Sequence, residues 1–485
     1  MRIGVALAVA AAFGLAVFAR WGSWSAPFDD PHGWVEAHHA TMARDFATGG
    51  ILRHGILPVQ NLPPQGEQLD GYNHWPPLFP MMVAGWWTIF GEGEAQARLL
   101  MLLVLVLGAW GIATLATAAG ARHGWIAAVI WLVVPLQMVF GLKLIHLQAA
   151  LVAGIWAFAL KLRGHPRWAA VCAAVAMSFS WEPGLAIGLA FLLAPRGERR
   201  SWFGLVATVG ATFVAILGFY ALSRPDLLEN LRAALVMRSG LDPTALHHTD
   251  LHGFYDGVKI SRPYAFMESL HKWRLRANQS FGLLLLAVVG LSPFLARRLP
   301  RTMWTVTLAW LGALAAWFLI FRNHATVHAY EMQLCLPFVA LAIAGACSWE
   351  RMPRVVLVIL TVVTLAHGGL SAYKRFKIRP TAEPELDVRI GREIQAQVPQ
   401  GSIVILPGHS MLPLWYTQRH VFRGVSTPMA YESMLARYQE LYPEPRPALW
   451  MALTKESDPT LEAIFAGREP LYASEIVRLY RLAPE

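Results

Sequence analysis

The sequence predicts a polytopic α-helical membrane protein of about 11 spans, with a large first outer loop and a small C-terminal α/β extracytoplasmic domain. Three observations carry this prediction. First, 55% of the 485 residues are hydrophobic and 15% are charged, whereas a soluble domain carries roughly 25% charged residues. Second, the mean hydropathy is +0.41, and long apolar runs recur along residues 1–372. Third, basic residues cluster at every second loop between these runs, as the positive-inside rule requires of cytoplasmic loops.

The distribution of charge along the sequence limits the kinds of partner that the protein can bind. The formal net charge is +10, which by itself would suggest nucleic acid. Much of the Arg and Lys lies in short loops between apolar runs, so we expect membrane lipids and no nucleic acid as partners. Cys172, Cys335 and Cys347 all fall inside hydrophobic runs. We interpret them as small core residues and expect neither a disulfide framework nor a cysteine metal site.

The apolar runs divide the chain into alternating crossings. Residues 3–20 are either a signal peptide cleaved near WSA or a first helix. Cleavage there would leave Pro27 just after the cut, so we favour a retained helix with a cytoplasmic N-terminus. A short interfacial helix in HHATMARDFATGG and a Trp-rich helix in PPLFPMMVAGWWTIFG follow. Further spans are predicted at 92–120, 124–140, 146–161, 202–222, 280–296, 303–321, 332–348 and 355–372, with two short helices in 168–194 that meet at SFSWEPG.

This alternation places four polar segments on the outer side. Three are outer loops of a transmembrane domain that covers residues 1–372, at 21–80, 223–279 and 322–331. The fourth is the tail, residues 373–485. It contains a helix in GREIQAQ, a buried strand in SIVIL, a short strand in HVFRG, an amphipathic helix in MAYESMLARYQELY and a final strand in SEIVRLYRL. This order of elements predicts a small α/β domain.

Three carboxylates of the first outer loop are candidate catalytic groups, namely Asp29, Asp30 and Glu36. Charged groups beside a bilayer are costly to desolvate, so a cluster of them points to chemistry or ligand binding. A carboxylate there can act as a general base that takes a proton from an acceptor hydroxyl or amine. The alternative interpretation is that the two aspartates cap the following helix or solvate the loop.

Histidines in the same loop raise the question of a metal. His38 and His39 are adjacent, so on a helix they point about 100° apart and form no obvious chelate. The loop has no HExxH and no other diagnostic spacing, so we expect no metal and no cofactor, and interpret the histidines as polar interface residues. A metal site shared with other histidines of the loop is the alternative. His39, which follows Glu36 by three positions, and Asn73, beside the proline pair of NHWPPL, are candidate cavity-lining residues.

Cationic and hydroxyl donors gather at the predicted outer ends of the later spans. RNHATVHAYE supplies Arg322, His324, His328 and Tyr330, and GLKLIHLQ supplies Lys143 and His146. Such donors suit a phosphate or pyrophosphate head group. Alternatively they are snorkelling side chains beside an aromatic belt residue. Glu182 lies at the break within 168–194, and a helix break at membrane depth usually lines a cavity.

The order of these motifs resembles a known family. One long first outer loop contains an early acid, an AR-x-(F/L)-x-x-G helix and a PPL motif, here Asp29-Asp30, Ala43-Arg44-Asp45-Phe46 to Gly49, and Pro76-Pro77-Leu78. FGEGEAQARLL, SWEPG and RNHATVHAYEMQLCLP are similar to later segments of the same proteins. The pattern, which covers residues 1–372, resembles the C superfamily of integral-membrane glycosyltransferases, in particular the branch of protein mannosyltransferases and aminoarabinose transferases.

The resemblance implies an inverting glycosyltransferase that takes a sugar from a polyprenyl phosphate at the outer face. Asp29 or Asp30 would be the base by position, whereas counting back from Ala43-Arg44 without gaps puts Glu36 near the family's acid. His74 lies where relatives place a polar or basic residue before PPL, and His328 and Tyr330 would hold the donor phosphate. The acceptor, whether lipid, glycan or protein, is left open. The composition suits a bacterial inner membrane.

Two other functions are compatible with a polytopic envelope protein. A transporter or flippase for a lipid-linked sugar predicts repeated halves and charged residues deep inside spans, and the sequence shows neither. A non-catalytic envelope assembly protein would use the tail domain to bind a partner.

Overall fold

The computed structural model describes residues 2–18, 24–28, 32–52, 56–59, 74–223, 227–241, 264–282, 299–348, 354–377, 385–408, 410–425, 427–442, 444–455 and 457–482. Three predicted site residues, Asp29, Asp30 and Asn73, lie outside the described residues, as does most of the span predicted at 280–296.

Helices make up most of the described chain. In the first 377 residues they are α1 (Arg2–Phe18), α2 (Gly33–Gly49), α3 (Leu78–Phe90), α4 (Glu94–Ala118), α5 (Trp125–Val133), α6 (Pro135–Phe140), α7 (His146–Leu162), α8 (Pro166–Phe179), α9 (Glu182–Leu193), α10 (Arg196–Ser223), α11 (Leu227–Ser239), α12 (Phe266–Phe281), α14 (Arg301–Ile320), α15 (Arg322–Val327), the 3₁₀ helix η3 (Ala329–Leu334), α16 (Cys335–Ala346) and α17 (Arg354–Lys377). The tail contributes α18 (Leu386–Gln397), β1 (Ile403–Ile405), α19 (Met411–Thr417), β2 (His420–Phe422), α20 (Pro428–Leu441), β3 (Leu449–Thr454), α21 (Pro459–Ile464), β4 (Tyr472–Ala473) and β5 (Val477–Leu482).

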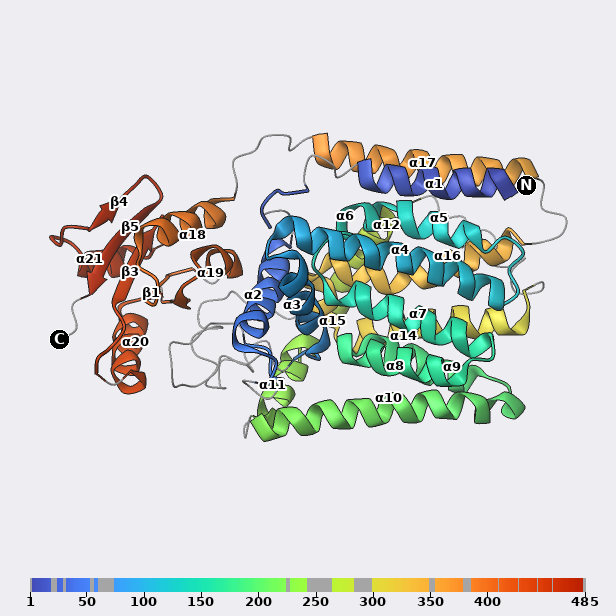
Figure 1. The fold of residues 1–485 in the computed structure, drawn as a ribbon, viewed down its shortest axis with the longest axis horizontal. Helices are drawn as coiled ribbons and strands as arrows, with labels where there is room; N and C mark the ends of the chain where they lie inside the picture. The colour runs from blue at the N-terminus through green and yellow to red at the C-terminus, as the bar shows by residue number, and fades with distance from the viewer. Residues whose placement is uncertain are drawn as a thin grey trace.

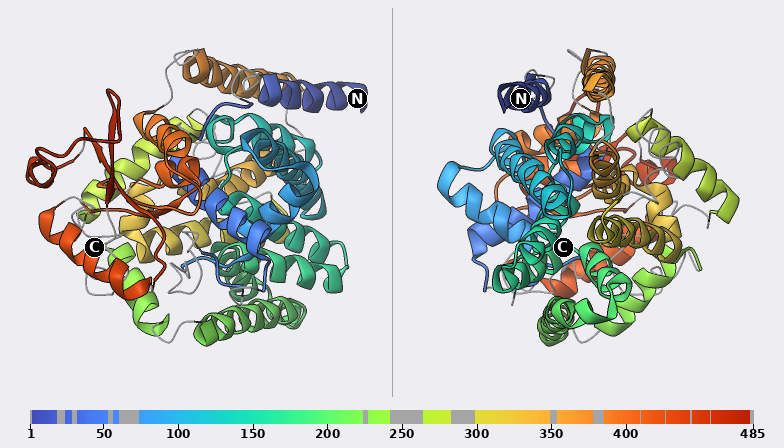
Figure 2. Two further views of the ribbon diagram at one scale, coloured as in Figure 1. Left: turned by 60° about the vertical axis from the view of Figure 1, so that its left-hand side comes forward. Right: turned by 90° about the vertical axis from the view of Figure 1, so that its right-hand side faces the viewer.

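The long apolar helices run along one axis as a bundle, and the C-terminal domain sits at one end of it (Figure 1). Within the described residues, α4, Arg196–Leu222 of α10, α14 and Ala329–Ala346 are long and apolar enough to cross a membrane, and shorter apolar helices lie beside them. α4 contacts α7, which contacts α8, and α14 contacts α9 and α16. α1 and α17 lie side by side at the edge of the bundle (Figure 2). The prediction of a helical, multi-pass membrane protein is therefore confirmed.

Two predicted helix breaks have different outcomes. The break in SFSWEPG is confirmed, because α8 ends at Phe179, α9 begins at Glu182, and Ser180 between them is extended. The span predicted as continuous at 124–140 is instead divided into α5 and α6. Val134 adopts an extended conformation because the ring of Pro135 disfavours the helical one in the preceding residue.

The segment predicted as a polar outer loop at 223–279 contains two helices in its described parts, α11 and α12, which sequence analysis did not predict. Both helices contribute buried side chains, with Ala234 and Arg238 buried on α11 and Trp273 on α12. Their charged residues lowered the apparent hydrophobicity of the segment and concealed the helical period. Figure 1 shows α11 at the end of the bundle that faces the C-terminal domain.

The helix predicted to lie at the interface, α2, is buried along most of its length, from Val35 through Phe46. The predicted end is confirmed, since the helix stops at Gly49 and Gly50 adopts φ 82°. Its burial has a tertiary cause. α2 lies against α3 on one side and against α19 of the C-terminal domain on the other (Figure 1). The sequence of α2 has no apolar stripe that would predict this burial. Much of the surface of the helix is instead covered by polar partners.

The C-terminal domain is built on a five-stranded sheet with the order β2-β1-β3-β5-β4. β1 pairs in parallel with β2 and β3, and β5 pairs antiparallel with β3 and β4. The strands predicted in SIVIL, HVFRG and SEIVRLYRL and the helices predicted in GREIQAQ and MAYESMLARYQELY are present. Sequence analysis missed β3, LWMALT, whose six residues are all buried and therefore show no alternation.

The C-terminal domain is joined to the bundle through α19. The guanidinium of Arg44 on α2 lies 3.8 Å from the ring centre of Trp415 and donates to the Trp415 carbonyl at 3.0 Å. Its other nitrogens reach Glu92, at 2.6 Å for the shorter contact. Trp415 also stacks on Trp87 of α3, with ring centres 5.5 Å apart. These contacts give a structural role to the arginine of the AR motif.

Replacing Trp415 by alanine should weaken the contact between the C-terminal domain and the helical bundle. The change removes a buried indole, its stacking on Trp87 and its cation–π contact with Arg44, and we expect a loss of about 3–5 kcal/mol. Thermal unfolding of the purified protein would measure the loss, and limited proteolysis would report release of the tail. The matched control is Met429→Ala, since Met429 is 80% exposed in the same domain. Equal melting temperatures for the two variants would contradict this account of the docking.

Candidate functional site

The candidate site is a buried polar cluster around Trp75, which we call the Trp75 cluster. The ring of Trp75 lies 4.6 Å from that of His146, 5.8 Å from that of Trp317 and 5.9 Å from that of His324, measured between ring centres. Arg238 lies over the same ring, at 4.8 Å from its centre. Four segments far apart in the sequence therefore meet at one tryptophan.

The position of Trp75 follows from its local sequence. Pro76 and Pro77 restrict the backbone before α3 begins at Leu78. Hydrogen bonds also fix the backbone carbonyls of His74 and Trp75. Trp181 donates its indole N–H to the carbonyl of His74 at 3.0 Å, and Tyr220 donates its hydroxyl to the carbonyl of Trp75 at 2.8 Å. The helix break at SWEPG thus supplies a side chain that fixes the NHWPPL turn.

Arg238 is a functional candidate that sequence analysis missed. It lies in the last turn of α11 and is 9% exposed. A guanidinium is always charged and costly to bury, so its placement over an aromatic ring indicates a site that needs a permanent positive charge. The available signal was a basic residue within ALVMRSG, a mostly apolar stretch of a segment otherwise predicted to be a polar loop.

Glu331 is a second group that sequence analysis missed. Its side chain is fully buried in η3, and both oxygens are engaged. Oε1 lies 3.0 Å from Nε2 of His324, and Oε2 accepts the indole N–H of Trp317 at 2.9 Å. His328 follows on the same segment, with its ring centre 4.3 Å from that of His324 and 5.3 Å from that of Tyr330. The predicted residues His324, His328 and Tyr330 therefore do come together.

Two further pairs connect α2 to the segment between α6 and α7. Nε2 of His39 lies 2.9 Å from Nδ1 of His146, and Nζ of Lys143 lies 3.1 Å from Oε2 of Glu36. Oε1 of Glu36 accepts the backbone N–H of Leu144 at 3.2 Å. Glu36 and Lys143 were predicted as a base and a phosphate ligand respectively. Here each is the other's ionic partner, which favours a shared structural role.

The chain that leads into the first-loop aspartates is held from two sides. Arg98 of α4 donates to the carbonyls of Trp24 and Ala26 at 2.8 and 2.6 Å. Tyr416 of α19 accepts the backbone N–H of Phe28 at 2.7 Å and donates to Glu94 at 2.8 Å. Phe28 directly precedes Asp29. The bundle and the C-terminal domain together therefore determine where the loop with the candidate bases begins.

Other predicted residues lie at the margin of the cluster. Glu182 is fully buried at the start of α9, within electrostatic range of Glu331 and Arg238, and its carboxylate makes no hydrogen bond of good geometry within the described part of the chain. Arg322 begins α15 and lies beside Gly240, at the end of α11. Among the described residues, no group of three or more His, Cys, Asp and Glu side chains is arranged to hold a metal ion.

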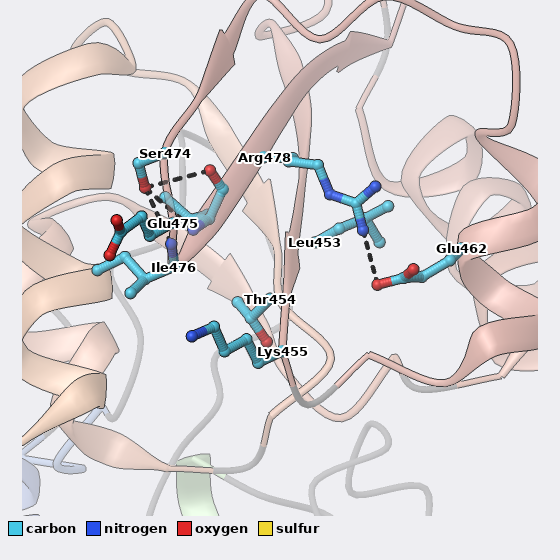
Figure 3. A pocket seen from close by; sticks show the side chains of 9 residues that line it. Leu453, Thr454, Lys455, Glu462, Ser474, Glu475, Ile476 and Arg478 are labelled. Atoms are coloured by element: carbon cyan, nitrogen blue, oxygen red, sulfur yellow. Dashed lines mark hydrogen bonds and ion pairs between the residues drawn. The ribbon is translucent and has the colours of Figure 1, made fainter.

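A separate pocket lies in the C-terminal domain, between β3, β5 and α21 (Figure 3). Arg478 and Glu462 at its edge form an ion pair at 2.7 Å, and both are more than a third exposed. Ser474 donates to Glu393 at 2.6 Å. This pocket lies at the surface and brings together fewer buried polar groups than the Trp75 cluster, which remains the better candidate.

Comparisons with known proteins agree with the fold. No family model matches the sequence, and no curated protein sequence matches it. Among solved structures, the chain is similar to ArnT from Cupriavidus metallidurans bound to undecaprenyl phosphate, with 14% identity, a TM-score of 0.61, and 98% of this chain and 97% of that chain covered. It is also similar to the Archaeoglobus fulgidus oligosaccharyltransferase in complex with Zn and sulfate, with 14% identity, a TM-score of 0.56, and 92% and 67% covered. At these identities the matches establish the fold.

The histidines of the site make the stability of the protein depend on pH. Burial lowers the pKa of His38, His39, His324 and His328, to about 3 for His39, so these rings are neutral in the folded protein at neutral pH. The unfolded chain binds protons on them from about pH 6.5 downward. Stability should therefore be complete above that pH and fall below it, by up to about 1.4 kcal/mol per pH unit for each histidine.

Thermal unfolding between about pH 8 and about pH 5 would test this expectation. His39→Asn should make the acid branch shallower, because it removes one buried neutral ring. His165→Asn is the control, since His165 is exposed in the turn before α8. A melting temperature that stays constant across the range would show that the rings are not buried as neutral groups.

Proposed function

We propose that this chain, whose fold is that of the C superfamily of integral-membrane glycosyltransferases, transfers a sugar from a polyprenyl-phosphate donor to an acceptor at the outer face of the membrane. The proposal includes about 11 spans, a C-terminal domain outside the cytoplasm, and inversion at the anomeric carbon. The acceptor is a lipid, a glycan or a protein. A bacterial inner membrane is the proposed location.

The observation that carries the proposal is the buried guanidinium of Arg238 over Trp75. It lies among imidazoles that are neutral, so the cluster offers one permanent charge and several polar groups to an anion. A phosphodiester attached to a polyprenyl chain suits this arrangement. Its lipid tail needs apolar helices beside the site, and its phosphate needs a cation that water does not screen. ArnT from Cupriavidus metallidurans, one of the solved structures with a similar fold, was obtained bound to undecaprenyl phosphate.

The proposed chemistry places few demands on the protein. The bond between the anomeric carbon and the phosphate oxygen breaks with its electron pair on the phosphate, which is a good leaving group. Arg238 would stabilise the charge that develops there. His74, His324, His328 and Tyr330 are proposed as further phosphate ligands, and Arg322 as a cation near the entrance of the site. The proposed chemistry draws on no metal and no other cofactor.

The acceptor must lose a proton as it attacks, and we assign the base to the first-loop carboxylates. The ion pair between Glu36 and Lys143 supports Asp29 or Asp30 over Glu36. Both oxygens of Glu36 are occupied, one by the ammonium of Lys143 and one by the backbone N–H of Leu144, so fewer of its lone pairs are directed at an acceptor group. Glu36 and Lys143 would then position α2 against the segment before α7, while His39 and Glu182 border the cavity for the substrates.

Arg238→Ala should lower kcat/KM for sugar transfer by at least about 100-fold, because a desolvated anion then has no fixed counter-charge. Arg238→Lys should recover part of the activity, since it keeps the charge and loses the planar fork. Transfer of radiolabelled sugar by purified protein in vesicles is the measurement. Arg232→Ala is the matched control, an exposed arginine on the same helix. Activity of Arg238→Ala within a few-fold of the wild type would remove the basis of the proposal.

The three carboxylate variants Asp29→Asn, Asp30→Asn and Glu36→Gln separate the base from its rivals. One of the aspartate variants should lower kcat by about 100-fold or more with a nearly unchanged KM, as expected for loss of a general base. Glu36→Gln should instead lower the melting temperature, because it removes the charge of a buried carboxylate that pairs with Lys143. Retained transfer in all three variants would exclude a first-loop carboxylate as the base. Flipping of the donor by vesicles without any transfer would favour the transporter.

A further inference from the structure

The hydroxyl of Tyr416 joins the C-terminal domain to the start of the first outer loop and to the bundle. It accepts the backbone N–H of Phe28 at 2.7 Å and donates to Oε1 of Glu94 at 2.8 Å. A backbone N–H can only donate, so the hydroxyl oxygen accepts from it and keeps its own proton for the carboxylate. Tyr416 and Phe28 are both buried. Three segments far apart in the sequence therefore meet at one hydroxyl group.

The position of this hydroxyl is determined within the C-terminal domain. Tyr416 lies on α19, which packs against α18 of the same domain and beside α2 of the bundle (Figure 1). α18 approaches closely because Gly391 has no side chain, since a Cβ there would lie 2.6 Å from Cβ of Tyr416. Arg392 lies over the Tyr416 ring, 5.3 Å from its centre. The ring is thus packed from behind, and its hydroxyl is directed at the loop.

The bundle holds the same stretch of backbone from the other side. Arg98 of α4 donates to three carbonyls in the stretch 24–27, at 2.8, 2.6 and 3.2 Å. Arg98 follows Glu94 by four positions, so both side chains project from one face of α4. The first turns of α4 thus hold the carbonyls of 24–27 directly and the N–H of Phe28 through Tyr416.

The fixed end of this stretch adjoins the candidate bases. A Cβ at Gly33 would lie 2.3 Å from the carbonyl oxygen of Phe28, so the start of α2 passes directly against Phe28. Asp29 and Asp30 connect these two points in the sequence. A general base acts only within hydrogen-bond reach of the proton that it takes. A displacement of about 1 Å, even one caused from a distance, can cost roughly 100-fold in rate.

We propose that Tyr416 and Glu94 are positioning residues for sugar transfer, through which the C-terminal domain sets the place of the first-loop base. Neither side chain contacts the substrates in this scheme, and each acts through the backbone of Phe28. The inference rests on the proposed function, because it assumes that Asp29 or Asp30 takes the proton of the acceptor. It gives the C-terminal domain a part in the rate of transfer. Binding of the donor is assigned to the Trp75 cluster and should not depend on this hydroxyl.

Tyr416→Phe removes the hydroxyl and keeps the ring against Arg392. We expect kcat for transfer to fall about 10- to 100-fold, because the backbone before the base loses its anchor. The KM for the donor and the Kd of undecaprenyl phosphate should stay unchanged. Transfer of radiolabelled sugar in vesicles gives the kinetic constants, and calorimetry with undecaprenyl phosphate gives the Kd. Tyr472→Phe is the matched control, since its hydroxyl donates to Glu393 within the same domain and should leave kcat unchanged.

Two variants of Glu94 test whether the hydroxyl acts through this carboxylate. Glu94→Gln keeps an oxygen that can accept the Tyr416 hydroxyl, so it should retain most of the wild-type kcat. Glu94→Ala removes the acceptor and should lower kcat without changing the Kd of undecaprenyl phosphate. Combined with Tyr416→Phe, Glu94→Ala should cause little further loss, because both changes break one chain of hydrogen bonds. If Tyr416→Phe fails to fold, the two Glu94 variants still decide.

The outcomes separate this inference from the proposed function. A wild-type kcat in Tyr416→Phe or in Glu94→Ala overturns the inference and leaves the proposed function standing. The same holds if undecaprenyl phosphate binding weakens as much as kcat falls, because the change would then disturb the whole site. Fully additive losses in the double variant overturn the link between the two residues. A wild type that transfers no sugar overturns the inference and the proposed function together.

Discussion

The burial of one guanidinium organises the end of the helical bundle. Removing the charge of Arg238 from water costs several kcal/mol, and the face of Trp75 offsets part of that cost. Glu182 and Glu331 lie in electrostatic range of the same guanidinium. The surrounding histidines stay neutral, so they add no repulsion. This arrangement requires the NHWPPL turn, the last turn of α11 and the segment from α15 to η3 to meet at one place.

The C-terminal domain is part of the scaffold that supports this end of the bundle. Arg44 couples α2 to Trp415, and Tyr416 holds the backbone at Phe28, immediately before the first-loop aspartates. The AR motif on α2 is therefore a docking element. This explains why α2 can be buried although its sequence carries Glu36, His38, His39, Arg44 and Asp45. A role for the tail as an independent partner-binding module has less support than one in shaping the loop.

For the site, the sequence indicates which segments contribute residues, but it gives less information about which side chains contact one another. RNHATVHAYE is predicted to supply phosphate ligands, and three of its predicted residues, His324, His328 and Tyr330, lie together. Sequence analysis did not select Glu331 in the same segment. An acid close to basic residues in the sequence is consistent with an exposed ion pair, and only the structure shows that this acid is buried. Lys143 is predicted as a phosphate ligand because it is a cation at the predicted outer end of a span. Its ion pair with Glu36, 107 positions away in the chain, becomes visible only in the tertiary structure. Sequence analysis did not select Arg238, because it places α11 within a polar loop.

What the sequence by itself determined is the helical, membrane-protein character of the chain. Hydropathy and the spacing of basic loops are local properties, so they indicated the apolar helices, the break at SWEPG and the α/β character of the tail. The tertiary structure alone decided which charges face one another. Burial and pairing depend on contacts between distant segments, such as Arg238 with Trp75, Glu36 with Lys143 and Arg44 with Trp415. The energy of a charge in a protein is set by those contacts and by the exclusion of water, and neither can be deduced from the residues adjacent to it in the sequence.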